Sequence, residues 1–165
     1  MKNLKIRYQM VKDAADFLRI LKNPNFIYFF VNVDTLADEK AALKKNSERR
    51  KNNESWNYTF LYNDKVVGGG GVRINRTRPY IGELGYFLDE KYWGRGLTTA
   101  FVKLMEQEGF NKLGLSRIEI LMRPENKASE KVAIKNGYKK EGRLKKVIKD
   151  REGRLHDAFI YAKVL

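Results

Sequence analysis

The sequence predicts a single mixed α/β domain of the α+β kind, with a mostly antiparallel sheet flanked by helices. Three observations lead to this fold class. The chain has 165 residues, which suits one domain with one hydrophobic core. Apolar residues make up 42% and charged residues 33%, an ordinary globular balance. Segments with the alternation of strands and segments with the spacing of helices follow one another along the chain.

The first third of the chain predicts one strand and two helices. Residues 4–9 alternate as a strand does. Apolar residues recur at helical spacing over 13–22, which predicts the first helix. A second helix is expected over 35–50, because Thr35 followed by Asp38 resembles a capping box.

The rest of the chain predicts an antiparallel meander and then alternating helices and strands. Strands are expected over 56–62, 65–74 and 80–88, and the middle one contains a run of four glycines at 68–71. The remaining elements are expected to be a helix over 94–110, a strand over 118–122, a helix over 126–135 and strands over 138–147 and 155–164.

Composition excludes several kinds of site. The chain has no cysteine, so disulfides, cysteine metal sites and a thiol nucleophile are impossible. A single histidine, His156, excludes a multi-histidine metal site, and we expect no metal. No signal peptide or membrane-length apolar run is visible, so a soluble cytoplasmic protein is expected, either a monomer or a homodimer.

The net charge of +14 indicates attraction to polyanions or, equally well, a solvated basic surface. Polyanionic partners include nucleic acid, ribosomes, acidic membranes and phosphorylated cofactors. The positive residues are scattered and no nucleic-acid motif is visible, so no specific nucleic acid and no membrane partner are expected.

A glycine turn between a strand and a helix is the most informative local feature. Gly94 and Gly96 precede a predicted helix, whose first N–H groups and positive dipole end suit an anionic phosphate. Arg95, Thr98 and Thr99 could add donors. The spacing fits neither a Walker loop nor a dinucleotide fingerprint, and a tight structural turn is the alternative explanation.

Several motifs together resemble one enzyme family. The segment 91–96, Lys-Tyr-Trp-Gly-Arg-Gly, resembles the Q/R-x-x-G-x-G/A motif of the GNAT superfamily of N-acetyltransferases, with Lys in the first place. The segment Gly-Glu-Leu-Gly-Tyr-Phe-Leu at 82–88 is similar to the RimJ/RimL branch. The segments at 126–131, 136–138, 141–142 and 153–165 resemble that branch too. The resemblance covers nearly the whole chain.

The resemblance implies acetyl-CoA as cofactor and a sheet splayed at its central strands. In this family the pantetheine arm pairs with the backbone of the splayed strand, and the pyrophosphate lies on the glycine turn. The implied coenzyme A residues are Phe87, Leu88, Asp89, Lys91, Trp93, Gly94, Arg95, Gly96, Leu97, Thr98, Thr99, Asn126, Ser129 and Lys131. A strand end without ligand, a helix cap and solvated lysines are the alternatives for parts of this set.

The resemblance also implies catalytic roles. Glu83 is the candidate base, and an exposed edge carboxylate is its alternative reading. The N–H of about Leu88 would face the thioester oxygen. Many family members carry a tyrosine acid seven residues after the asparagine, where this chain has Ala133. Ser129 is therefore the candidate acid, unless it serves only in the first turn of the helix that Asn126 caps.

The acceptor amine is open at this level. Phe29 and Trp56 are expected to wall the acceptor cleft, by resemblance, with Glu83 in it, although aromatic residues also form cores. Asp157 either binds a cationic amine or braces the sheet. A protein or peptide α-amine, such as a ribosomal protein N-terminus, is the expected acceptor. The alternatives are a small-molecule amine such as a polyamine, antibiotic or amino-acid-like compound, and a non-catalytic acyl-CoA-binding module.

Overall fold

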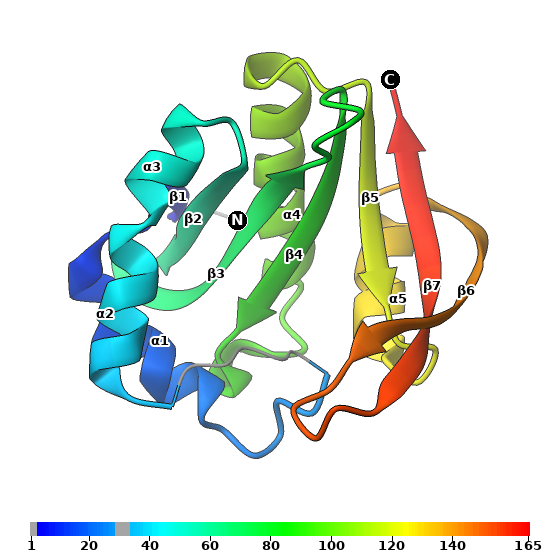
Figure 1. Cartoon of the computed structure of the whole chain (residues 1–165). Helices are drawn as coiled ribbons and strands as arrows, with labels where there is room; N and C mark the ends of the chain where they lie inside the picture. Colours follow the sequence, from blue (N-terminus) through cyan, green and yellow to red (C-terminus); the bar gives the residue numbers. More distant parts are fainter. Residues whose placement is uncertain (1–2, 29–33) are drawn as a thin grey trace.

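The computed structural model describes residues 3–28 and 34–165, which form one seven-stranded sheet with helices on both faces (Figure 1). The strands are β1 (Leu4–Tyr8), β2 (Ser55–Tyr62), β3 (Lys65–Ile74), β4 (Ile81–Leu88), β5 (Arg117–Met122), β6 (Lys139–Lys149) and β7 (Leu155–Val164). The helices are α1 (Ala14–Leu21), α2 (Leu36–Lys44), α3 (Asn46–Lys51), α4 (Leu97–Gln107) and α5 (Lys127–Lys135). The described residues also contain three short helical turns: η1 (Val11–Asp13), η2 (Glu90–Tyr92) and the π-helical η3 (Glu108–Lys112).

The strands lie in the order β1-β2-β3-β4-β5-β7-β6. Each neighbouring pair is antiparallel except β4 and β5, which are parallel. A parallel pair needs a crossover connection, and α4 supplies it. This arrangement confirms the predicted fold class. Among the described residues, no helix has the length and apolar character needed to cross a bilayer.

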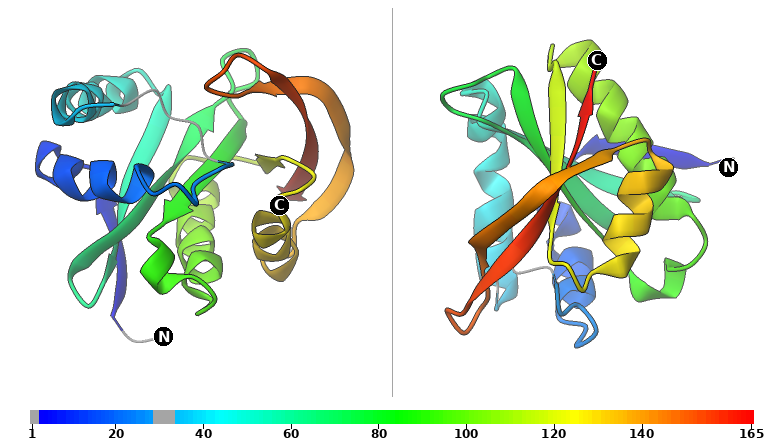
Figure 2. Two further views of the ribbon diagram at one scale, coloured as in Figure 1. Left: turned by 90° about the horizontal axis from the view of Figure 1, so that it is seen from below. Right: turned by 90° about the vertical axis from the view of Figure 1, so that its right-hand side faces the viewer.

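Two apolar cores hold the helices to the sheet. Helices α1, α2 and α3 lie on one face, and α4 and α5 lie on the other (Figure 2). The larger core joins α4 and α5 to the sheet around Phe60 and Phe101, whose rings stack at 4.4 Å. The smaller core joins α1 and α2 to β4 through Phe17, Leu43 and Phe87. The side chains of β4 therefore alternate between two different environments.

The elements expected from the sequence are present, with two differences. The single helix expected over 35–50 is two helices, α2 and α3, with Lys45 between them. Directly after this break the buried Asn46 side chain donates to Gln9 Oε1 at 2.8 Å and accepts from Asn57 Nδ2 at 3.2 Å. Helix α4 begins at Leu97 rather than at residue 94, because both glycines of the preceding turn have positive φ.

The central strands β4 and β5 pair only at their beginnings. Their register runs from Ile81 opposite Arg117 to Glu83 opposite Glu119 and then stops. Beyond Glu83 the two strands diverge toward their carboxyl ends, as Figure 1 shows. Strand β3 remains paired with β4 as far as Leu88. The sheet is thus splayed between β4 and β5.

Candidate active site

The splay leaves one backbone edge of β4 without a strand partner. Asp89 N donates to Val67 O of the neighbouring chain segment at 2.7 Å, so the backbone at position 89 faces β3. Backbone groups alternate in direction along an antiparallel strand. The N–H and C=O groups of Tyr86 and Leu88 therefore point away from β3, into the space where β5 has diverged. A backbone N–H or C=O group that is buried away from water needs a hydrogen-bond partner.

The end of β4 is fixed by side chains around it. The indole Nε1 of Trp93 donates to Leu88 O at 2.7 Å, which leaves the Leu88 N–H as the donor of that residue. Asp89 accepts from Arg19 Nη1 at 2.7 Å and from Lys91 N at 3.1 Å. The carboxylate of Asp89 is therefore occupied by protein groups. Lys91 itself is exposed.

The glycine turn lies directly after this strand end and is open to solvent. Gly94 and Gly96 both have φ of 74°, a conformation that favours glycine, and both are exposed. Gly96 is the residue before α4, so the first N–H groups of the helix, from Leu97 to Thr99, point toward the turn. A Cβ placed on Gly94 would meet no atom within 4 Å. The turn can receive an anionic group at close range.

Helix α5 brings Ser129 to the splayed strand. The Ser129 hydroxyl and the Tyr86 hydroxyl lie 2.7 Å apart. Burial raises the pKa of Tyr86 to about 12, although its hydrogen bond to Ser129 lowers it, so the phenol stays protonated at neutral pH. Asn126 Oδ1 accepts from Ser129 N at 3.1 Å and caps α5. Ala133 of the same helix is fully buried in the core.

Glu83 lies on the opposite face of the splayed strand from Tyr86. Its two carboxylate oxygens each lie 2.9 Å from Arg73 Nη2, and its side chain is 39% exposed. The neighbouring carboxylate across the parallel pair, Glu119, accepts instead from Arg117 Nε at 2.6 Å. Glu83 is the carboxylate of this pair that lines the cavity described next.

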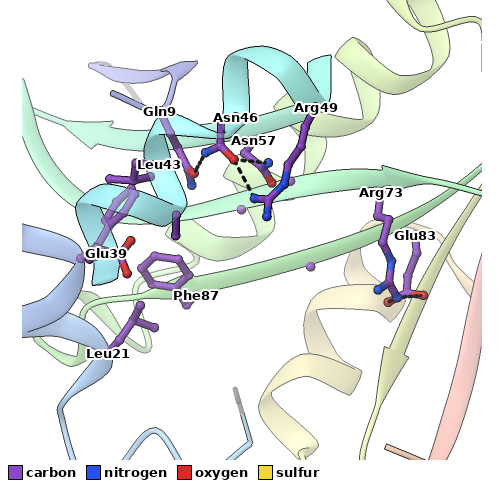
Figure 3. Close-up of a pocket in the computed structure, with 15 residues that line it drawn as sticks. Gln9, Leu21, Glu39, Leu43, Asn46, Arg49, Asn57, Arg73, Glu83 and Phe87 are labelled. Carbon is purple, nitrogen blue, oxygen red and sulfur yellow. Dashed lines mark hydrogen bonds and ion pairs between the residues drawn. The ribbon is translucent and has the colours of Figure 1, made fainter. Parts of the chain in front are cut away.

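A cavity of about 290 Å³ lies on the face covered by α1, α2 and α3. Figure 3 shows its lining, with Glu83 and Arg73 at one end and Phe87 and Leu43 at the other. Gly85 of β4 lies between them, and a Cβ added there would meet no atom within 4 Å. The missing side chain keeps the surface of β4 open toward the cavity.

The structure separates the residues expected at the acceptor site. Trp56 lies on the other face of the sheet from Glu83, where it packs against the core beside α4, so it does not line the cavity. Successive side chains of a strand point to opposite faces of the sheet, so Asn57 faces the cavity and the preceding Trp56 does not. Phe29 lies outside the described residues.

Asp157 is engaged by the β6–β7 hairpin. Its carboxylate accepts from Lys146 N at 3.0 Å and from Arg143 Nε at 2.8 Å, and these contacts lower its pKa. Asp157 therefore braces the hairpin through these contacts. Lys131 of α5 is exposed at the helix surface.

Tyr86 and Gly85 are site residues that sequence reasoning did not single out. Both lie inside the segment that resembles the enzyme family. Alternation alone places Tyr86 on the face opposite Glu83, as for any core residue, and only the contact with Ser129 makes it a candidate site residue. From the sequence alone, Gly85 is a glycine that weakens a strand. Its importance follows from the cavity that it lines in the structure.

Comparison with known proteins matches this geometry to one family. The model of the acetyltransferase (GNAT) domain matches residues 3–139. The probable N-acetyltransferase YjcK of Bacillus subtilis is 29% identical over 157 residues, which cover 90% of this chain and 87% of YjcK. The uncharacterized N-acetyltransferase p20 of Bacillus licheniformis is 33% identical over 99 residues, 60% of this chain and 55% of p20, so the match spans about half the length of p20.

Solved structures share the whole fold. The RimL ribosomal L7/L12 α-N-protein acetyltransferase in complex with coenzyme A superposes with a TM-score of 0.88 at 21% identity. The superposition covers 100% of this chain and 96% of the RimL chain. At this identity the likeness establishes the fold.

Proposed function

The chain belongs to the GNAT family of N-acetyltransferases, and we propose that it transfers the acetyl group of acetyl-CoA to the α-amine at the N-terminus of a peptide or protein. The observation that carries this proposal is the unpaired edge of β4. It has the open glycine turn at its end, the Tyr86–Ser129 pair on one side and Glu83 with the cavity on the other. Donor and acceptor would thus approach the same backbone segment from opposite faces.

The residues present fit coenzyme A. The glycines at 94 and 96 and the first turn of α4 offer free amides and a positive dipole end for the pyrophosphate. The outward N–H and C=O groups of Tyr86 offer a donor and an acceptor for the amides of the pantetheine arm. Arg95 and Lys91 are exposed cations near the turn. When bound, acetyl-CoA supplies the thioester that is attacked.

The chain's own groups can accept the amine proton, stabilise the oxyanion and protonate the leaving thiolate. As the amine nitrogen bonds to the thioester carbon, the amine proton would pass to Glu83 through a water molecule. The N–H of Leu88 would donate to the oxygen that becomes an oxyanion. The hydroxyls of Tyr86 and Ser129 would supply a proton to the thiolate that leaves the acetyl carbon. Arg73 would hold the Glu83 carboxylate in place.

Three observations favour an α-amine of a polypeptide as acceptor. The cavity of about 290 Å³ in front of β4 gives a chain terminus room to place its amine at Glu83 and its first side chain over Gly85. The RimL neighbour is by its name an α-N-protein acetyltransferase of a ribosomal protein. The charge of +14 suits a substrate displayed on a polyanion such as a ribosome.

An acceptor screen tests this proposal. Release of free thiol from acetyl-CoA is followed with short peptides, the same peptides with blocked N-termini, polyamines and aminoglycosides. We expect thiol release with free-N-terminus peptides and none with blocked ones. Turnover of small amines alone would show that the acceptor assignment is wrong, and binding of acetyl-CoA without any turnover would show a non-catalytic module.

Glu83→Gln tests the base. We expect its rate to fall by about a hundredfold, with acetyl-CoA affinity unchanged and the alkaline-rising limb of the pH–rate profile flattened. Glu119→Gln is the matched control, because it removes the neighbouring charge across the same strand pair. A larger loss in Glu119→Gln than in Glu83→Gln would remove Glu83 from the mechanism.

A further inference from the structure

Glu39 is a buried carboxylate in helix α2, where the only other buried residue is the apolar Leu43. The residue is 6% exposed, whereas its neighbours Asp38 and Lys40 are exposed. It lies four residues before Leu43 on the inward stripe of α2 and lines the cavity that contains Glu83. In Figure 3 its carboxylate points into the cavity beside Phe87. Burial raises its pKa.

Glu39 differs from the other buried carboxylates of the described chain in its partners. Each of the others accepts from a cationic side chain: Asp13 from Arg7, Asp89 from Arg19, Glu106 from Lys163 and Asp150 from Arg154. Within residues 3–28 and 34–165, no side chain bonds to Glu39. The carboxylate oxygens of Glu39 are open to the cavity rather than sealed in the core, so a bound group can reach them. Its position against the cavity therefore indicates that a ligand supplies the missing partner.

The two arginines that line the cavity donate to groups other than Glu39. Arg49 donates to Asn46 Oδ1 at 3.1 Å, and Arg73 pairs with Glu83. Glu39 consequently remains available inside a cavity of about 290 Å³, at the end away from Arg73 (Figure 3). An acceptor amine placed at Glu83 would have the rest of its structure extending toward Glu39.

We infer that Glu39 binds a second positively charged group of the acceptor, so that preferred acceptors carry a cation besides the amine that is acetylated. For a peptide this group is a basic side chain on the first residue. The inference rests on the proposed function in that the cavity receives the acceptor. The charge of +14 repels cations at long range, so Glu39 acts by contact rather than by steering.

Paired acceptors measure this selectivity. Two peptides differ only at the first residue, which is lysine in one and norleucine, of similar length and without charge, in the other. We expect kcat/KM to be about tenfold or more higher for the lysine peptide, as a charge-assisted hydrogen bond implies. Glu39→Gln should bring the ratio close to one. Glu48→Gln, which removes an exposed charge from α3, should keep the wild-type ratio.

A second measurement separates this role from a structural one. Removal of a buried unpaired charge relieves its desolvation, so Glu39→Gln should melt at a higher temperature than wild type while it loses selectivity. A variant that loses both stability and activity would show that Glu39 supports the fold instead. Equal kcat/KM for the two peptides in the wild type would overturn the inference.

Binding keeps the inference testable if peptides are not acceptors. Cadaverine and pentylamine differ by one cationic group, and calorimetry compares them without any turnover. We expect the wild type to bind cadaverine more tightly and Glu39→Gln to bind the two alike. Selective binding without peptide acetylation would overturn the α-amine proposal alone, whereas absence of selectivity with active peptides would overturn only the role of Glu39.

Discussion

Replacement of Tyr86 by Phe removes one hydroxyl between β4 and α5 and leaves the ring that packs against the core. The hydroxyl contacts Ser129 Oγ at 2.7 Å in a largely buried position, so its loss should cost about 1 kcal/mol of stability. In a chain of this size that corresponds to a fall of about 2–4 °C in Tm. If the same hydroxyl donates to the leaving thiolate, the rate should fall much more, by about a hundredfold.

The two effects are separated by a cycle of variants. Tyr86→Phe, Ser129→Ala and the double variant are assayed for thiol release at saturating acetyl-CoA and for Tm. Groups that act as one proton donor are not additive, so the double variant should be hardly slower than the slower single variant. Wild-type kcat in both single variants, with only the small fall in Tm, would reduce the pair to a structural contact.

Three further predictions concern the cofactor turn, the cavity and stability. Gly96→Asp should lose most acetyl-CoA affinity in calorimetry, whereas Gly114→Asp, at a similar φ of 66°, should keep it; equal affinity in both would remove the turn from the cofactor site. Gly85→Val should fold, since its Cβ meets no atom within 4 Å, and should raise the acceptor KM with acetyl-CoA affinity kept; an unchanged acceptor KM would place the acceptor elsewhere. Burial raises the pKa of Asp13, but the hydrogen bonds from Arg7 and its other neighbours outweigh burial, so the pKa is lowered overall. The ion pair of Asp13 therefore stabilises the fold above the ordinary carboxyl pKa of about 3.9, and this stabilisation is lost as pH falls through the pKa of the folded state. Asp13→Asn should cost about 3 kcal/mol at neutral pH and flatten the acid limb of stability measured by urea unfolding; an unchanged acid limb would show that Asp13 does not control it.

The sequence predicted the order of strands and helices well, because the local patterns and the tertiary structure agree in most elements. Alternation in the meander and helical spacing before and after it are local properties. The break at Lys45 escaped prediction because it coincides with hydrogen bonds between Asn46 and the distant Gln9 and Asn57. Such contacts leave no periodic signal.

The site was predictable where backbone chemistry defines it and not where tertiary contacts do. Gly94 and Gly96 allow the turn to be predicted from the sequence, since a backbone conformation with positive φ favours glycine. The register of β2 decides that Trp56 faces α4, and a one-residue shift reverses such an assignment. In the sequence Glu39 is one of several charged residues of α2, and its position against the cavity follows only from the tertiary structure.

A crystal structure of this chain with coenzyme A bound tests the proposed position of the cofactor most directly. The pyrophosphate should lie on the turn at Gly94 and Gly96, and the pantetheine arm should lie along the free edge of β4. Its sulfur should lie close to Leu88 N and to the hydroxyls of Tyr86 and Ser129, with the cavity of Glu83 on the other side. Coenzyme A bound away from the edge of β4, or a sulfur remote from Leu88 N, would contradict the account.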